Sequence, residues 1–295
     1  MTYSIVARDP RTGELGVAVQ SHWFAVGASV PWARPGVGAI ATQANIEVSY
    51  GPRALELLHA GGAAPDVLAR LLSEDPGAAG RQVAIVDAAG RVAVHTGSAC
   101  IPLAGHVTGD GVSCQANIMA GDGVWPAMLD AFTATDGPLT PRLLDALDAA
   151  EAAGGDIRGR QSAALLVVPA TGDWWETVIS LHVEDHPEPL AELRRLVELD
   201  GAYMLAGEAD ELVNEGRHDA AALLYEQAGE LAPGSHELRF WAGLGAAQAG
   251  DLERGVAEVR QAIAMHPGWR PLLERLPAAV APSAQAVLAR LRADE

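Results

Sequence analysis

The stretch TYSIVARDPRTGELGVAVQ, residues 2–20, decides how the first half of the chain is interpreted. It holds two apolar runs, residues 4–7 and 15–20, on either side of a loop that contains Pro10 and Gly13. Apolar runs of this length around turn-forming residues are typical of a β-hairpin. We therefore predict that the chain begins inside a β-sheet.

Blocks of strands and blocks of helices follow one another up to about residue 181. The further predicted strands lie at residues 37–43, 82–87, 92–95, 106–108, 112–117, 162–168 and 176–181. Two helices, ending near Gly62 and Ser73, are expected after the first of these strands, and two more at about 121–132 and 141–153. This order favours a layered sandwich of helices, sheet, sheet and helices, because a doubly wound fold would alternate single strands with single helices.

The last third of the chain has the character of helix alone, and it repeats itself. An amphipathic helix is expected over residues 186–201. From residue 202 onward small residues and prolines recur at a spacing of 34: Gly216 and Gly250, Ala228 and Ala262, Pro233 and Pro267. This is the spacing of the tetratricopeptide repeat (TPR), in which small residues let paired helices approach closely.

These features predict an α+β protein in three parts. A four-layer αββα domain is expected over residues 1–185, a linking helix over 186–201, and an all-α, TPR-like region over 202–295. About two repeats are fewer than the roughly three that a free-standing array needs. We therefore expect the helices to lean on the first domain or on another subunit, and a homodimer is the expected assembly.

The composition argues against several classes of partner. Lys and Arg number 20 against 38 Asp and Glu, which gives a formal net charge of -18. Binding to nucleic acid or to an anionic membrane surface is not expected, because both depend on cations that face phosphate. No apolar run reaches the ~18 residues that span a bilayer, and Arg8 and Asp9 stand where a signal peptide would have its apolar core. A cytoplasmic protein is expected.

No pattern in the sequence points to a bound metal or cofactor. The two cysteines, Cys100 and Cys114, lack the spacing of metal ligands and are expected to be reduced core residues. Neither a Gly-rich phosphate loop nor a Gly-x-Ser-x-Gly nucleophile elbow occurs. Cofactor-free hydrolysis fits these absences.

Thr2 is the most informative single position. An initiator Met before a small residue is commonly removed, and removal of Met1 would give Thr2 a free α-amine. One residue would then carry both a nucleophilic hydroxyl and a base, because an α-amine has a pKa of about 7.7–8.0. The strand that follows would hold the hydroxyl in place. The alternative is that Met-Thr is an ordinary start of a chain.

Six short motifs together carry a resemblance to a known family. They lie at residues 2–9, 16–19, 24–27, 41–44, 50–53 and 154–164. Over about 180 residues the chain resembles the DUF1028 family, which is placed in the N-terminal-nucleophile (Ntn) hydrolase superfamily. The resemblance implies an Ntn-hydrolase-like αββα fold and suggests hydrolysis of an amide bond, without naming a substrate.

The resemblance also assigns roles to individual residues. Thr2 falls where Ntn hydrolases place the nucleophile, and Asp156 resembles the aspartate that supports its amine, although it could equally be a turn residue. The backbone N–H groups around Gln43, Ala44 and Asn45 are expected to face the developing oxyanion. Residues expected to lie beside the amine or the substrate complete the set, namely Gln115 and Asn117 at the end of their strand.

Three further polar residues are weaker candidates for the site. Arg34 is a loose positional substitute for the strand lysine of proteasome-like sites, and it could anchor charge but could not act as a base. His22 follows the second strand and is either packed or catalytic. Arg160, with Arg158 two residues before it, could bind a carboxylate or simply solvate a loop.

Two hypotheses follow from the sequence. The first is an N-terminal-threonine amidohydrolase that cleaves a C–N bond in a small amide, lactam or peptide-like substrate through an acyl-enzyme on Thr2. The second is a non-catalytic Ntn-like scaffold whose TPR-like helices bind a protein partner, because a fold alone does not decide a function.

Overall fold

The computed structural model describes residues 2–294 and divides into two compact units. The first unit ends at Arg194 and contains both β-sheets, and the second runs from Arg195 and is all helical. Met1, on whose removal the proposed chemistry depends, lies outside the described residues. The protein is therefore of the mixed α+β class that the sequence predicts.

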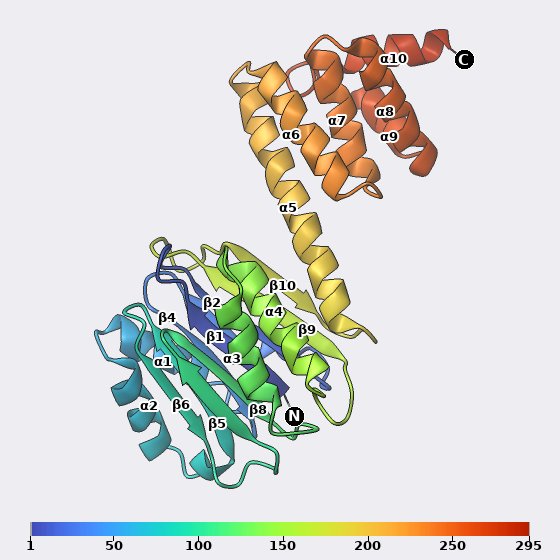
Figure 1. The fold of residues 1–295 in the computed structure, drawn as a ribbon. Coiled ribbons are helices and arrows are strands. Elements are labelled where there is room, and N and C mark those ends of the chain that lie inside the picture. The colour runs from blue at the N-terminus through green and yellow to red at the C-terminus, as the bar shows by residue number, and fades with distance from the viewer. Residues whose placement is uncertain (1, 295) are drawn as a thin grey trace. The chain divides into compact units, whose positions relative to one another are not determined.

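Two antiparallel sheets form the centre of the first unit (Figure 1). The larger has the strand order β10-β9-β2-β1-β8-β7 and the smaller the order β3-β4-β5-β6. The strands of the larger sheet are β1 (Thr2–Arg8), β2 (Leu15–Ser21), β7 (Gly105–Gly109), β8 (Val112–Asn117), β9 (Ser162–Val168) and β10 (Ile179–Val183). Those of the smaller sheet are β3 (Pro31–Arg34), β4 (Gly38–Ala44), β5 (Arg81–Asp87) and β6 (Val92–Thr96).

Helices cover the outer face of each sheet, so the expected four layers are confirmed. Helices α1 (Tyr50–His59) and α2 (Ala64–Ser73) pack on the smaller sheet. Helices α3 (Val124–Ala134) and α4 (Leu139–Ala152) pack on the larger one, and the inner faces of the sheets pack on each other. The apolar core between the sheets is made largely of Val and Ala, as the scarcity of aromatic residues requires.

The alternation of side chains along β1 explains where Thr2 lies. Ser4 bonds to Gln43 on the opposite sheet, whereas Tyr3 bonds to Glu151 on α4. Successive side chains of a strand point to opposite faces, so Thr2 belongs to the inner face with Ser4. Because β1 is flanked by β2 and β8, Thr2 starts an interior strand.

Some element boundaries differ from those predicted. The short strand β3 was not expected, since four residues are too few to show a periodicity. β10 begins at Ile179 rather than near residue 176. Helix α5 runs unbroken from Pro189 to Asn214, so it includes the predicted linking helix except for residues 186–188 and continues into the predicted repeat region that begins at residue 202. No proline after Pro189 interrupts it.

Paired helices make up the second unit, which α5 enters at Arg195. The others are α6 (His218–Leu231), α7 (His236–Gln248), α8 (Leu252–Met265), α9 (Trp269–Arg275) and α10 (Ala284–Ala293). Gly216 and Gly250, one period apart, occupy the turns after α5 and α7 with positive φ. Such left-handed residues end helices at low cost only when they are glycine.

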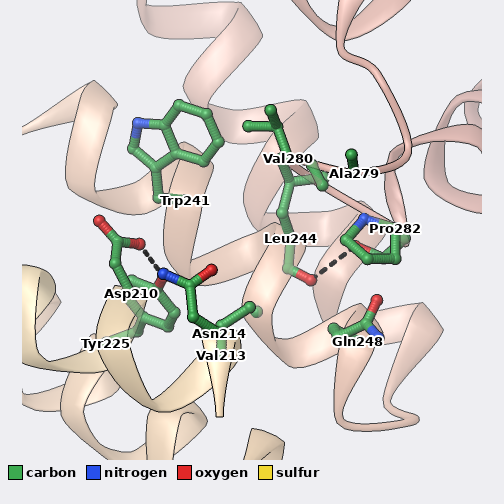
Figure 2. Close-up of a pocket in the computed structure, with 13 residues that line it drawn as sticks. Asp210, Val213, Asn214, Tyr225, Trp241, Leu244, Gln248, Ala279, Val280 and Pro282 are labelled. Atoms are coloured by element: carbon green, nitrogen blue, oxygen red, sulfur yellow. Dashed lines mark hydrogen bonds between the residues drawn. The ribbon is translucent and has the colours of Figure 1, made fainter. Parts of the chain in front are cut away.

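The second unit contains a cavity of about 420 Å³ among α5, α6, α7 and the segment before α10. Figure 2 shows Trp241 and Val280 at this cavity, with Asp210 nearby. The carboxylate of Asp210 accepts a hydrogen bond from the hydroxyl of Tyr225.

None of the helices described within residues 2–294 combines the length and the apolar character that a membrane span requires.

Close approach of two helices fixes the packing of α7 on α8. A Cβ on Gly243 would lie 2.9 Å from the carbonyl oxygen of Gly255 and 2.9 Å from Val259 Cγ2. By contrast, a Cβ on Gly229 in α6 would meet nothing within 4 Å. The two helical glycines are therefore a matched pair.

We predict that Gly243→Ala lowers the free energy of unfolding by about 1–3 kcal/mol, because the added methyl group overpacks the helix contact. Gly229→Ala should instead raise it by about 0.5–1 kcal/mol, because Ala loses less backbone entropy in a helix. Denaturant unfolding followed by circular dichroism measures both. Equal effects of the two substitutions would contradict the close approach of α7 and α8.

Candidate active site

A cavity of about 380 Å³ lies where β1, β2 and β4 reach one end of the sandwich. Its walls combine apolar side chains with a few polar ones: Thr2, Trp23, Val26, Ser29, Val30, Gln43, Ala44, Asn45, Ile46, Ile101, Ile118 and Arg158. A second cavity of about 200 Å³ shares Ala44, Asn45, Ile101 and Ile118 with the first and adds Asn117 and Cys100. Because the two cavities share these lining residues, they are neighbours, and we refer to them together as the cleft.

Thr2 is fixed on both sides and reaches this cavity. Thr2 pairs with Asn117 of the neighbouring strand β8, and 6% of its surface is exposed. The carbonyl oxygen of Thr2 accepts hydrogen bonds from Gln43 Nε2 at 3.3 Å and Asn117 Nδ2 at 3.4 Å. The Thr2 hydroxyl lies 3.1 Å from Ser21 Oγ at the end of β2. The hydroxyl is thus held at the wall of a cavity by a rigid sheet.

A chain of buried amides anchors the backbone of Thr2. Gln43 Oε1 accepts from Ser4 Oγ at 2.7 Å, and Gln43 Nε2 donates to Gln82 Oε1 at 2.8 Å. Gln115 Nε2 donates to the same serine at 2.6 Å, and Gln115 does not line either cavity. The side chain of Gln43 therefore joins the two sheets, whereas that of Gln115 bonds within the larger sheet to Ser4 and Ser113. The structure thus places Gln115 away from the expected contact with a substrate.

Gln82 is the centre of this chain, and sequence analysis did not identify it. Its Oε1 also accepts from Asn117 Nδ2 at 2.9 Å, while its Nε2 donates to the carbonyl of Ala116 at 2.8 Å and to Thr96 Oγ1 at 2.9 Å. Gln82 has no exposed surface. Its only signal in the sequence is a polar residue at the start of an apolar run.

The turn after β4 directs one backbone amide toward the cavity. The N–H of Thr42 donates to Val30 O at 3.2 Å, on the β3 side of the strand. Alternate amides of a strand point the same way, so the Ala44 N–H points past the end of β3, where the cavity lies. The N–H of Asn45 is directed away from it and donates to Gly80 O at 3.1 Å. Among the three predicted donors, Ala44 fits best.

Arg81 holds the same turn from outside. Its Nη1 donates to Asn45 O at 2.7 Å, and its Nε donates to Asp75 Oδ2 at 2.8 Å. The hydrogen bond from Arg81, assisted by one from the Gly77 N–H, lowers the pKa of Asp75 to about 2. Neither Arg81 nor Asp75 was singled out from the sequence.

Asp156 is buried beside the end of β2, where it contacts His22, the residue that follows the serine in contact with Thr2. Its Oδ2 accepts from the His22 N–H at 3.1 Å, and its two oxygens form a bidentate pair with Arg158 Nε and Nη2 at 3.3 and 3.0 Å. Arg158 in turn lines the cavity. Asp156 thus fastens the loop 156–160 to the start of the loop that follows β2.

Besides Gln115 and Asp156, three further predicted residues line neither cavity. The ring of His22 faces the carbonyl of Arg160, with Nδ1 at 3.3 Å. Arg160 pairs with Glu151 and Glu188, so it does not share a direction with Arg158. Arg34 pairs with Gly38 at the far end of β4, five residues from Gln43, which is roughly 17 Å along a strand.

Backbone strain gathers around the same cavity. Among residues 2–294 the non-glycine residues with positive φ are Ala25, Ala44, Leu103 and Ile118. Ala44 and Ile118 line the cavity, Ala25 precedes the lining residue Val26, and Leu103 follows Ile101 by two positions. A left-handed conformation costs about 1–2 kcal/mol per residue and is rarest for β-branched side chains. Strain of this kind tends to concentrate at functional sites.

Comparison with known families identifies the first unit. The model for "Family of unknown function (DUF1028)" matches residues 2–193. The chain belongs to the DUF1028 family. The resemblance found in the sequence is thereby confirmed for the family itself. No significantly similar sequence was found among curated proteins.

Solved structures include another DUF1028 member. One is the crystal structure of a DUF1028-family protein from Silicibacter pomeroyi, which is 34% identical to this chain and gives a TM-score of 0.62. The match covers 67% of this chain and 84% of the Silicibacter chain. Anbu, the ancestral beta-subunit from Yersinia bercovieri, is 12% identical, covers 65% of this chain and 92% of its own, and gives a TM-score of 0.31. The DUF1028 region contains all the residues that line the cleft.

The described residues of this DUF1028 protein contain no group of three or more His, Cys, Asp or Glu placed to hold a metal ion. The thiol of Cys100 lines the smaller cavity, donates to the carbonyl of Arg81 at 3.4 Å, and has a pKa raised by burial. The more deeply buried Cys114 also has a raised pKa for the same reason. Neither thiol has the lowered pKa of a cysteine nucleophile.

We predict that Gln82→Leu lowers the free energy of unfolding by about 3 kcal/mol, because it removes partners from buried polar groups of Asn117 and Ala116. Gln161→Leu is the matched control, since the side chain of Gln161 bonds at the surface to Asp185. It should change stability by no more than about 0.5 kcal/mol. Denaturant titration of both variants measures the difference, and a mild effect at Gln82 would contradict the network.

Asp75 should give a pH-dependent contribution to stability. Its pKa is about 2 in the folded chain and about 3.9 when unfolded, so its contribution is complete above about pH 4 and is lost as pH falls through 2. We predict that wild type and Asp75→Asn differ in unfolding free energy at pH 6, and that this difference shrinks between pH 4 and pH 2. A difference that stays constant over this range would contradict the assigned ion pair.

Proposed function

We propose that this DUF1028 protein is an N-terminal-nucleophile amidohydrolase that cleaves the C–N bond of a small amide, lactam or peptide-like substrate. One observation carries the proposal. Thr2 lines a cavity of about 380 Å³, while hydrogen bonds from two other strands fix the carbonyl of the same residue. A nucleophile that is both rigid and accessible is what attack on a bound carbonyl requires.

The proposed reaction begins once processing leaves Thr2 as the first residue. Its α-amine, with a pKa of about 7.7–8.0, takes the proton from Oγ1 as that oxygen bonds to the substrate carbonyl carbon. The carbonyl oxygen becomes an anion that the Ala44 N–H stabilises, and such a donor is worth roughly 3 kcal/mol. The C–N bond then breaks as the ammonium returns its proton to the leaving nitrogen, and water hydrolyses the resulting ester.

Neighbouring groups support this chemistry. Ser21 Oγ, 3.1 Å from the Thr2 hydroxyl, can orient it by a hydrogen bond. The buried carboxylate of Asp156 lies next to the same end of β2 and would favour the protonated form of the amine during the reaction. Asn117 acts through the carbonyl of Thr2 and the amide of Gln82, and it is therefore a positioning residue.

The proposal predicts that Thr2→Ala abolishes turnover of small amides, that Thr2→Ser keeps part of it, and that Thr12→Ala in the exposed β1–β2 loop changes nothing. Amine release is measured over a panel of amides, lactams and dipeptides. A β-lactone electrophile gives a second readout, since it should acylate Thr2 and leave the Thr2→Ala chain unlabelled. Equal turnover or labelling in wild type and Thr2→Ala would rule out the nucleophile.

A second candidate function is favoured by the cavity of about 420 Å³ in the helical unit. In this alternative the first unit is a non-catalytic scaffold, and the helices bind a protein partner through the surface around Trp241. The aromatic side chain and the cavity are the features that such binding sites use. Replacement of Trp241 by Ala would then impair partner binding, whereas Thr2→Ala would not.

A further inference from the structure

The side chains that line the Thr2 cavity are mainly apolar. Val26, Val30 and Ile46 belong to the core cluster between the sheets or pack against it, and they line the cavity at the edge of that core. The cavity is therefore a continuation of the hydrophobic interior. An apolar group of a ligand that entered it would leave water without displacing polar contacts.

Large apolar side chains are also exposed at the mouth of the cavity. Trp23 is 65% exposed and Ile101 is 59% exposed, although both line the cavity. Phe24 and Ile157, which adjoin lining residues in the sequence, are 64% and 62% exposed. Apolar side chains that gather on a soluble surface mark a binding site more often than single exposed residues do.

The loop that carries Trp23 is anchored, so this exposure is a property of the fold. The hydroxyl of Ser162 donates to the carbonyl of Trp23, and the N–H of Val26 donates to the same hydroxyl at 3.1 Å. The N–H of Ala25 donates to Glu184 O at 3.0 Å, with Ala25 in the left-handed region. These contacts fix the backbone that carries the exposed indole of Trp23.

Charge gives little attraction for an ionic ligand. Arg158 is the one charged side chain among the lining residues described for this cavity, and it already forms a bidentate pair with the buried carboxylate of Asp156. A substrate carboxylate would have to compete with that pair. An uncharged ligand meets no such competition.

We propose that the cavity selects amides whose acyl part is an uncharged apolar chain or ring of medium size. The inference rests on the proposed function for its chemistry and on the cavity walls for its specificity. A volume of about 380 Å³ admits on the order of ten non-hydrogen atoms, at roughly 30 Å³ each. Trp23 and Ile101 are the specificity-determining residues at the mouth, and Val26, Val30 and Ile46 form the inner wall.

The selectivity is tested first by binding, without chemistry. In the full-length Thr2→Ala chain, octanamide should displace the neutral fluorophore N-phenyl-1-naphthylamine at a concentration at least tenfold below that needed for acetamide. Each buried methylene contributes a factor of about four, so two buried methylenes would suffice for a tenfold difference. Adding Trp23→Ala should reduce the octanamide preference at least threefold. Trp174→Ala, which removes an exposed indole that does not line the cavity, and Trp241→Ala in the helical unit should leave it unchanged.

Acylation of the wild-type chain tests the Thr2 nucleophile separately from the apolar specificity of the cavity. A β-lactone with a hexyl substituent should label Thr2 at least tenfold faster than the methyl analogue, and Trp23→Ala should reduce this ratio. Equal affinity for octanamide and acetamide, or a preference that Trp23→Ala leaves intact, would overturn the apolar specificity. An octanamide preference without labelling of Thr2 by either lactone would support the apolar site and overturn the nucleophile.

Discussion

The hydrogen bonds that meet at Gln82 are the constraint on which the rest of the site depends. Gln82 is fully buried between the two sheets, and a polar group buried there without a partner costs about 1–3 kcal/mol. Gln43 and Asn117 both donate to Gln82 Oε1, and both also donate to the carbonyl of Thr2. The first residue of β1 is therefore fixed by the same amides that set one sheet against the other.

The network around Gln82 lies at the end of the sandwich where β4 and β8 end and the chain turns. The left-handed residues Ala44 and Ile118 follow or end strands that flank this network, and both line the cleft. The well-satisfied network can hold such conformations, because the surrounding structure over-determines them. A rigid hydroxyl, a directed backbone amide and an apolar cavity thus arise at one place from the way the strands end.

Much of the fold could be predicted from the sequence. Long apolar runs and their order gave the two sheets and four layers, and the 34-residue spacing located the glycine turns at Gly216 and Gly250. β3 was missed, because its four residues show no periodicity. The continuous α5 was not expected, because the start of the 34-residue repeat at residue 202 suggested a boundary that the backbone does not have.

The site could be predicted only in part. Thr2, the turn at Ala44, and Asn117 converge because each lies at a strand end, which the sequence shows. Gln82 and Arg81 were missed, since their roles depend on the register between elements distant in the chain. Arg34, a loose positional substitute in the sequence, lies at the far end of β4 from Gln43. Arg160 pairs with Glu151, which the sequence could not show because side-chain direction in a loop has no periodic signal.

The central claim is that Thr2 carries the free amine of the mature protein, and analysis of the N-terminus tests it most directly. Intact mass together with N-terminal peptide sequencing of the purified native chain should show Thr2 as the first residue, unblocked. A chain that retains a residue before Thr2, or one with an acylated amine at Thr2, would leave the hydroxyl without its base and would contradict the account.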